Sequence, residues 1–125
     1  MSEESYVFDT YAVIEIIRGN PRYERYTQAK VIINEFILAE LCWILIKDLG
    51  KVKAFGYIDE YAKYSVAVSK DIIKKAMLYR HEHIKRRLSM TDCLGYFLAK
   101  EFGIKFLTGD KEFKHMPNVE FVRKD

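Results

Sequence analysis

The residue most out of place in this sequence is Glu40. It lies between two apolar runs, 36–39 and 41–46, which predict a helix that is apolar on all sides and therefore buried. A carboxylate in such a helix is costly unless it is paired, protonated or bound to a metal. The alternative is a solvated Glu40 on a partly exposed face, but no other polar side chain marks such a face before Lys47. A functional role is therefore the preferred interpretation.

Three aspartates could join Glu40 in such a role, and each has an ordinary structural alternative. Asp9 follows a short apolar run and could cap the next helix, which on the sequence alone is as good an account as a catalytic role. Asp92 fits a capping box that opens at Ser89, with Asp in place of the usual Glu or Gln. Asp110 follows a glycine and could be a turn residue. Separate accounts of this kind leave unexplained why the acids fall at strand ends, at a helix start and inside an apolar helix.

The histidines are poor candidates for a metal site. His81 and His83 are two apart on a predicted helix, so they point in different directions, and His115 stands alone. Surface histidines are the better interpretation. The candidate ligands are carboxylates, which indicates a hard cation such as Mg²⁺ or Mn²⁺ rather than zinc.

Alternating strand and helix signals predict how the acids would be brought together. Short apolar runs predict strands at 6–8, 31–33, 65–68, 105–107 and 119–122. Helical spacing, caps and stop signals predict helices at 12–17, 35–49, 51–61, from Ser69 onward and from Ser89 to Gly103, with a short helix before Ala29. This order indicates an α/β fold with a mostly parallel sheet of about five strands between helical layers. In such sheets the functional site lies beyond the carboxyl ends of the strands, where Asp9 and Asp110 fall.

Length and composition indicate a single globular domain spanning residues 1–125. Half of the 125 residues are apolar and 31% are charged, a balance typical of a folded core. Cys42 and Cys93 lie in apolar helical stretches and are expected to be reduced core thiols. The acidic start, Met1–Glu4, is unlike a signal peptide, and the longest apolar stretch is too short to span a membrane. The expectation is a cytoplasmic protein with no membrane association.

The order of five segments resembles the PIN domain, in particular the small single-domain ribonucleases that serve as VapC-type toxins. These segments are 6–10 (YVFDT), 38–41 (LAEL), 88–92 (LSMTD), 99–103 (AKEFG) and 107–113 (LTGDKEF), and they extend over essentially the whole chain. The resemblance implies a three-layer α/β/α domain that acts as a Mg²⁺- or Mn²⁺-dependent endoribonuclease. The catalytic and metal-binding residues that it implies are Asp9, Glu40, Asp92 and Asp110, with Thr10 and Thr108 in supporting positions.

The chemistry of four crowded carboxylates agrees with that role. Their mutual repulsion would keep some of them protonated unless a cation were bound. A divalent ion relieves the repulsion, lowers the pKa of a bound water and screens charge on the scissile phosphate. Asp9, Asp92 and Asp110 are the candidates for direct ligands, whereas Glu40 ligates directly, binds through water or orients a water. Whether one ion or two would bind stays open.

Positive charge is concentrated in one segment of the chain. Residues 70–87 hold seven Lys and Arg against two acids, although the net charge of the whole chain is only +3. The segment precedes Asp92, so its end is expected near the acidic edge. The RNA-binding candidates within it are Arg80, Lys85, Arg86 and Arg87. A solvated helix face is an equally good account of these charges, because basic residues also suit a helix C-terminus.

The resemblance also implies two protein partners, a cognate antitoxin and a second copy of the chain. Helices 35–49 and 51–61 carry more apolar side chains than a small sheet can cover, and the chain has nine Tyr and eight Phe. Because aromatic side chains are enriched at interfaces, a homodimer through these helices is expected, although Trp43 alone is expected in the core. An antitoxin segment would lie in a groove near the acids and inhibit by bringing Arg or Lys to the carboxylates.

Other functions are compatible with parts of this pattern. A PIN-type nuclease could process RNA without being a toxin, and a PIN-like module could bind RNA or protein without catalysis, although the intact acids favour catalysis. A phosphoacceptor receiver domain would need paired acids after the first strand and Asp after the third. A haloacid-dehalogenase-like phosphatase would need Asp-x-Asp where this chain has Asp9-Thr10-Tyr11. Both of these are set aside.

Overall fold

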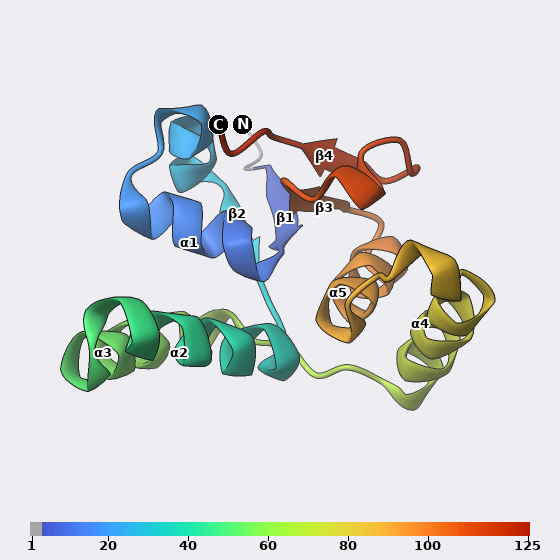
Figure 1. Ribbon diagram of the computed structural model, residues 1–125, viewed down its shortest axis with the longest axis horizontal. Helices are drawn as coiled ribbons and strands as arrows, with labels where there is room; N and C mark the ends of the chain where they lie inside the picture. Colours follow the sequence, from blue (N-terminus) through green and yellow to red (C-terminus); the bar gives the residue numbers. More distant parts are fainter. Residues whose placement is uncertain (1–3) are drawn as a thin grey trace.

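A computed structural model describes residues 4–125 and shows an α/β fold built on one parallel sheet (Figure 1). The strands are β1 (Ser5–Phe8), β2 (Lys30–Ile32), β3 (Lys105–Thr108) and β4 (Val119–Phe121). Their spatial order is β2-β1-β3-β4, and every pairing is parallel. The predicted α/β class and parallel sheet are confirmed, with four strands in the described residues where about five were expected.

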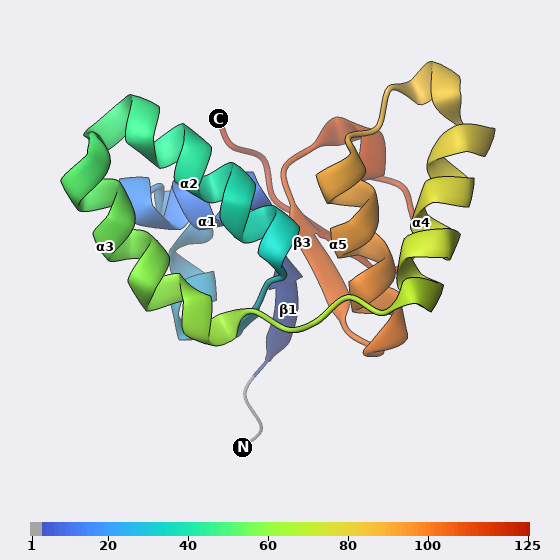
Figure 2. The same ribbon diagram turned by 90° about the horizontal axis from the view of Figure 1, so that it is seen from below.

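The prediction of a strand at 65–68 is wrong. Ser65 makes only an isolated parallel bridge with Ile33. The ladder stops there because the next residue, Asn34, caps a helix, so β2 offers no further partner. Residues 66–68 instead belong to an irregular segment that crosses between two pairs of helices (Figure 2).

The helices lie where local signals predict them. The α-helices are α1 (Thr10–Arg18), α2 (Glu35–Leu49), α3 (Lys51–Tyr61), α4 (Lys70–Glu82) and α5 (Met90–Glu101). Short 3₁₀ helices are η1 (Pro21–Gln28), η2 (Ala62–Tyr64), η3 (Ile84–Arg86) and η4 (Lys111–Phe113). The side chains that cap α1, α2, α4 and α5 each accept a hydrogen bond from a backbone N–H three residues further on; they belong to Asp9, Asn34, Ser69 and Ser89.

Within residues 4–125, no helix has the length and apolar character needed to cross a membrane.

Two crossovers arrange the helices in layers around the sheet. The chain leaves β1 through α1 and η1 to reach β2 on one side, and it returns through α2–α5 to β3 on the other side of β1. Because such crossovers are right-handed, α1 and α5 lie on opposite faces of the sheet. α5 packs closely on its face: a Cβ at Gly95 would lie 2.7 Å from Cε1 of Phe106. The predicted three-layer arrangement is confirmed.

α2 and α3 form a helical hairpin that stands beside the sheet (Figures 1 and 2). The inner side of α2, with Ile37, Leu41 and Leu45, is buried in the core. Its outer side is open, since Trp43 is 67% exposed. Val52, at the start of α3, is 85% exposed. The expectations that α2 is buried on all sides and that Trp43 belongs to the core are therefore wrong. α1 and α5 already cover the small sheet, which leaves only one side of α2 with a surface to pack against.

Candidate active site

The strand register aligns the residues that follow the strands. β1 pairs with β2 on one side and with β3 on the other. If these registers are continued one or two residues past the ends of β1 and β2, Asp9 lies between Asn34 and Thr108. α5 precedes β3 and runs back along the sheet (Figure 2), so the start of α5, with Asp92, reaches the same edge. Residues far apart in the chain therefore meet at the carboxyl end of the sheet.

Asp9 is both a helix cap and a buried carboxylate. Its Oδ1 accepts a hydrogen bond from the Ala12 N–H at 2.6 Å, and its Oδ2 accepts one from the Thr108 hydroxyl at 2.5 Å. The residue is only 3% exposed, and burial raises its pKa from 3.8 to about 6, although the bonds from Thr108 and Ala12 oppose the rise. The capping prediction is confirmed. Capping does not exclude ligation, because each oxygen keeps a second lone pair.

Thr108 connects Asp9 to Asp110. Its hydroxyl donates to Asp9 and accepts a hydrogen bond from the Asp110 N–H at 3.0 Å. Asp110 in turn caps η4, since its Oδ1 accepts the Glu112 N–H at 2.9 Å. One buried hydroxyl thus fixes the spacing of two of the predicted acids.

Asp92 is the carboxyl group most affected by its neighbours. Burial raises its pKa from 3.8 to about 8, and the negative charges of Asp9 and Asp110 contribute next. A hydrogen bond with the Ser89 side chain opposes the rise, and the charge of Glu40 adds to it. The other three predicted acids therefore all lie within electrostatic reach of Asp92.

Glu40 lies at the rim of this group rather than in an apolar interior. It is only partly buried, because α2 is open on its outer side. The cost of burying a carboxylate, which singled it out in the sequence, does not apply in this environment. Its charge still acts on Asp92, so Glu40 belongs to the acidic edge for a different reason from the one predicted.

The donor chemistry of this edge fits a hard divalent cation. All the candidate ligands are carboxylate oxygens, and burial, followed by the charges of neighbouring acids, raises the pKa values of Asp9 and Asp92. The hydroxyl of Thr10, beside Asp9, is also buried without a hydrogen-bond partner. As the side chains stand, no three His, Cys, Asp or Glu within residues 4–125 are grouped so that they could hold an ion. Metal binding therefore requires the carboxylates to turn toward a common point.

Three further residues at or near this edge were not assigned to a site from the sequence. Asn34 caps α2, yet its Nδ2 is buried without a partner; its place after a strand, like that of Asp9, was the available signal. Burial raises the pKa of Tyr23, and the charge of Asp9 raises it further. Lys124 acts on Asp9 with the opposite sign. No local pattern marks Tyr23 or Lys124, because both reach Asp9 only through the tertiary fold.

The sequence model of the PIN domain matches residues 6–119. The chain belongs to the PIN domain family. A comparison with curated proteins finds no match.

Several solved structures share the fold of this PIN domain. VapC20 of Mycobacterium tuberculosis, described as a sarcin-ricin loop cleaving toxin, is 19% identical, with a TM-score of 0.72 over 95% of this chain and 99% of its own. A toxin–antitoxin complex from Klebsiella pneumoniae is 18% identical, with a TM-score of 0.71 over 92% and 95%. VapBC2 from Rickettsia felis, bound to a promoter DNA fragment, is 20% identical, with a TM-score of 0.71 over 97% and 99%. These similarities support the fold of a VapC-type PIN domain.

The four basic candidates for RNA binding divide into two pairs in this PIN domain. Arg80 Nε donates to a backbone carbonyl 2.9 Å away. Arg86 pairs with the Glu112 carboxylate at 3.3 Å and also donates to the Glu112 carbonyl. These contacts connect η3, which contains Arg86, to η4, which contains Glu112. Lys85 and Arg87 are exposed. Lys85 and Arg87 are thus the better placed for a polyanion, and changes at Arg86 would also disturb the fold.

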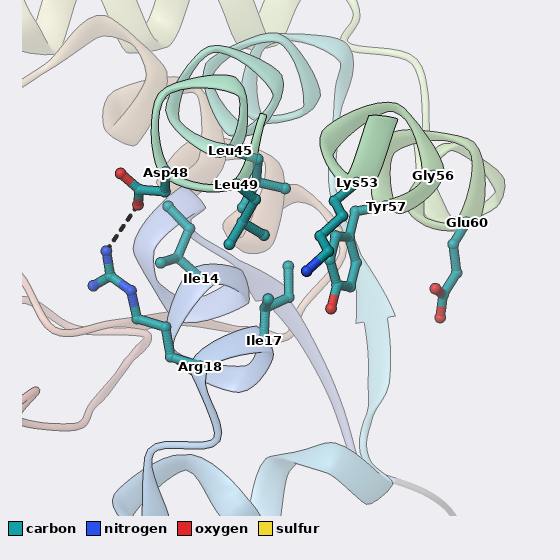
Figure 3. Close-up of a pocket in the computed structure, with 10 residues that line it drawn as sticks. All are labelled: Ile14, Ile17, Arg18, Leu45, Asp48, Leu49, Lys53, Gly56, Tyr57 and Glu60. Atoms are coloured by element: carbon teal, nitrogen blue, oxygen red, sulfur yellow. Dashed lines mark hydrogen bonds and ion pairs between the residues drawn. The ribbon is translucent and has the colours of Figure 1, made fainter. Parts of the chain in front are cut away.

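An apolar hollow of about 530 Å³ opens between α1 and the α2–α3 hairpin (Figure 3). Ile14 and Ile17 of α1 face Leu45 of α2 across it, and an ion pair of 3.0 Å joins Arg18 to Asp48 at one side. None of the four predicted acids lines this hollow. Its lining also includes the charged residues Lys53 and Glu60.

Proposed function

We propose that this PIN domain is a divalent-metal-dependent endoribonuclease that serves as the toxin of a toxin–antitoxin pair. The observation that carries the proposal is the grouping of Asp9, Asp92 and Asp110 at one edge of the sheet, where burial and mutual repulsion raise two of their pKa values. A structural ion-pair network would pair such acids with cations inside the fold. Among the ion pairs of residues 4–125, none involves Asp9, Asp92 or Asp110, so a cation bound from outside would stabilise this group.

Each residue has a distinct part in this proposal. Asp9, Asp92 and Asp110 would hold Mg²⁺ or Mn²⁺, and Glu40 at the rim would bind through water or orient one. The bound ion would supply compensating charge at the scissile phosphate and acidify a water molecule. Thr108 keeps Asp9 and Asp110 at a fixed spacing through its two hydrogen bonds.

The direct test is cleavage of RNA by the purified protein. Single-stranded or loop RNA should be cut when Mg²⁺ or Mn²⁺ is added, and EDTA should stop the reaction, because the carboxylates alone cannot compensate the phosphate charge. Product lengths on a denaturing gel measure the activity. RNA binding without cleavage in either ion would point to a binding module instead. Cleavage without growth arrest on expression in bacteria would point to an RNA-processing enzyme.

We propose that the cognate antitoxin uses the apolar hollow between α1 and the hairpin. Apolar side chains line its walls, including Ile14, Ile17 and Leu45. Because none of the acids lines the hollow, the antitoxin segment must extend beyond it to bring an Arg or Lys to the carboxylates. Two of the structures with this fold are a toxin–antitoxin complex and VapBC2, which supports a partner of this kind.

The outer face of the α2–α3 hairpin should carry a homodimer contact. Light scattering is expected to give a mass of about twice the 14.8 kDa chain, because Trp43 and Val52 are too exposed to be explained by the monomer core. Trp43→Glu should shift the mass to that of one chain. Leu78→Glu is the matched control, since Leu78 on α4 is also an apolar residue that is more than half exposed. A single-chain mass for the unmodified protein across a wide concentration range would contradict the dimer and leave the nuclease proposal intact.

A further inference from the structure

The segment that follows β4 is held in place by a hydrogen bond from Asn20, which lies two residues after the end of α1. Asn20 Nδ2 donates to the Lys124 carbonyl at 2.8 Å and to Glu15 Oε1 at 3.0 Å. Asn20 Oδ1 accepts the Arg22 N–H at 3.0 Å. Both ends of the Asn20 amide are therefore used, and the position of the Lys124 backbone is set by the fold.

A second contact brings the same segment against the end of β3. The Tyr23 hydroxyl donates to the Val122 carbonyl at 2.7 Å. Gly109, next to Asp110, leaves the space for this approach: a Cβ there would lie 2.8 Å from both the Tyr23 hydroxyl oxygen and the Val122 carbonyl oxygen. It would also lie 3.0 Å from Cγ of Lys124, so the Lys124 side chain starts directly beside the acidic edge.

The Lys124 ammonium ends over the start of α1. It lies 4.6 Å from the ring centre of Tyr11, which is 42% exposed and two residues from Asp9. Among the ion pairs of residues 4–125 none involves Lys124, so the ammonium keeps its capacity to bind an anion.

We propose that Lys124, held by Asn20 and supported on the Tyr11 ring, binds a phosphate of the RNA substrate at the acidic edge. This inference rests on the proposed function. A polyanion that approaches four carboxylates is repelled, and a fixed cation at their rim offsets that repulsion before any metal is bound. A lysine beside an exposed aromatic ring is also a common arrangement for single-stranded nucleic acids, in which the ring contacts a base and the cation a phosphate.

The test measures binding of a short single-stranded RNA in EDTA, by fluorescence anisotropy at several salt concentrations. Lys124→Ala should weaken binding by about 5- to 20-fold and reduce the slope of log affinity against log salt by about 0.7, the loss of one phosphate contact. Lys124→Arg should restore most of both. Lys100→Ala is the matched control, because the Lys100 ammonium also lies over an aromatic ring, 5.8 Å from Tyr96, near the far end of α5.

Cleavage kinetics with Mg²⁺ or Mn²⁺ provide the second measurement. Lys124→Ala should raise KM about as much as it weakens binding, with a smaller change in kcat. If the unmodified protein binds and cuts RNA while Lys124→Ala matches it in affinity, salt slope and KM, the inference is wrong and the nuclease proposal stands. If the unmodified protein neither binds nor cuts RNA, both are wrong.

Discussion

Replacing Asp9 by Asn should reduce RNA cleavage by about 100-fold or more, because a metal ligand that loses its charge forfeits several kcal/mol of transition-state stabilisation. The variant should remain folded. Asn keeps an oxygen that can accept from the Ala12 N–H. Its amide can donate to the Thr108 hydroxyl, which in the unmodified protein donates to Asp9. Initial rates on one RNA substrate, with circular dichroism to verify folding, measure the effect.

Asp110→Asn should cause a comparable loss, since the Asp110 side chain belongs to the same acidic group. Asp59→Asn is the matched control, because Asp59 is an exposed acid on α3. All variants must be purified in parallel, as a contaminating nuclease would cut RNA in every sample. Wild-type rates in the Asp9→Asn protein would show that the active site has been assigned to the wrong residues.

Asp92→Asn should stabilise the metal-free protein at neutral and higher pH. The folded-state pKa of Asp92 is about 8, against an ordinary value of 3.8, so folding favours the protonated form. The contribution of this group to stability is therefore complete below the ordinary pKa, falls as the pH rises, and is lost above about pH 8. Asn cannot ionise, so the variant should be more stable by on the order of 2 kcal/mol at pH 8, which corresponds to a rise of several degrees in Tm.

Thermal melts in EDTA between about pH 5 and pH 8 test this expectation. The Tm of the unmodified protein should fall relative to that of Asp92→Asn as the pH rises, and Asp59→Asn should follow the unmodified protein. Mg²⁺ or Mn²⁺ should raise the Tm of the unmodified protein, because the ion binds the folded acids and not the dispersed ones. In the Asp92→Asn protein, the rise in Tm on adding either ion should be smaller. Equal responses of the two proteins to pH and to both ions would count against a carboxylate metal site that includes Asp92.

The acidic edge could be predicted in part from the sequence, although the structure revises some of the reasons. Asp9 and Asp110 were singled out because ligand-binding residues commonly follow the strands of a parallel sheet, and both lie beyond the carboxyl ends of β1 and β3. Glu40 was found by an argument from burial, although it is only partly buried. Arg86 was grouped with Lys85 and Arg87 as RNA-binding, but its guanidinium is engaged with Glu112. Charge and position in the chain do not reveal which side chains already have partners.

Local signals in the sequence are enough to predict most helices and helix caps of this protein. The bounds of α2 and α3 and the caps Asp9, Asn34, Ser69 and Ser89 follow from signals within a few residues, because helical and capping hydrogen bonds close over three or four positions. Strand pairing has no such local rule. Residues 65–68 have a strand-like composition, yet β2 has no length left to pair with them beyond the bridge to Ser65.

The open side of α2 and the side chains around the acids follow instead from how the whole chain packs. The exposure of Trp43 depends on how much of the helix the sheet and its neighbours can cover. The Thr108 hydroxyl meets Asp9 across a separation of 99 residues. Lys124 reaches the same carboxylate from the segment after the last strand, through hydrogen bonds from Asn20 to its own carbonyl and from Tyr23 to that of Val122. Interactions of this kind depend on how the whole chain packs, since burial and charge act through space and not along the sequence.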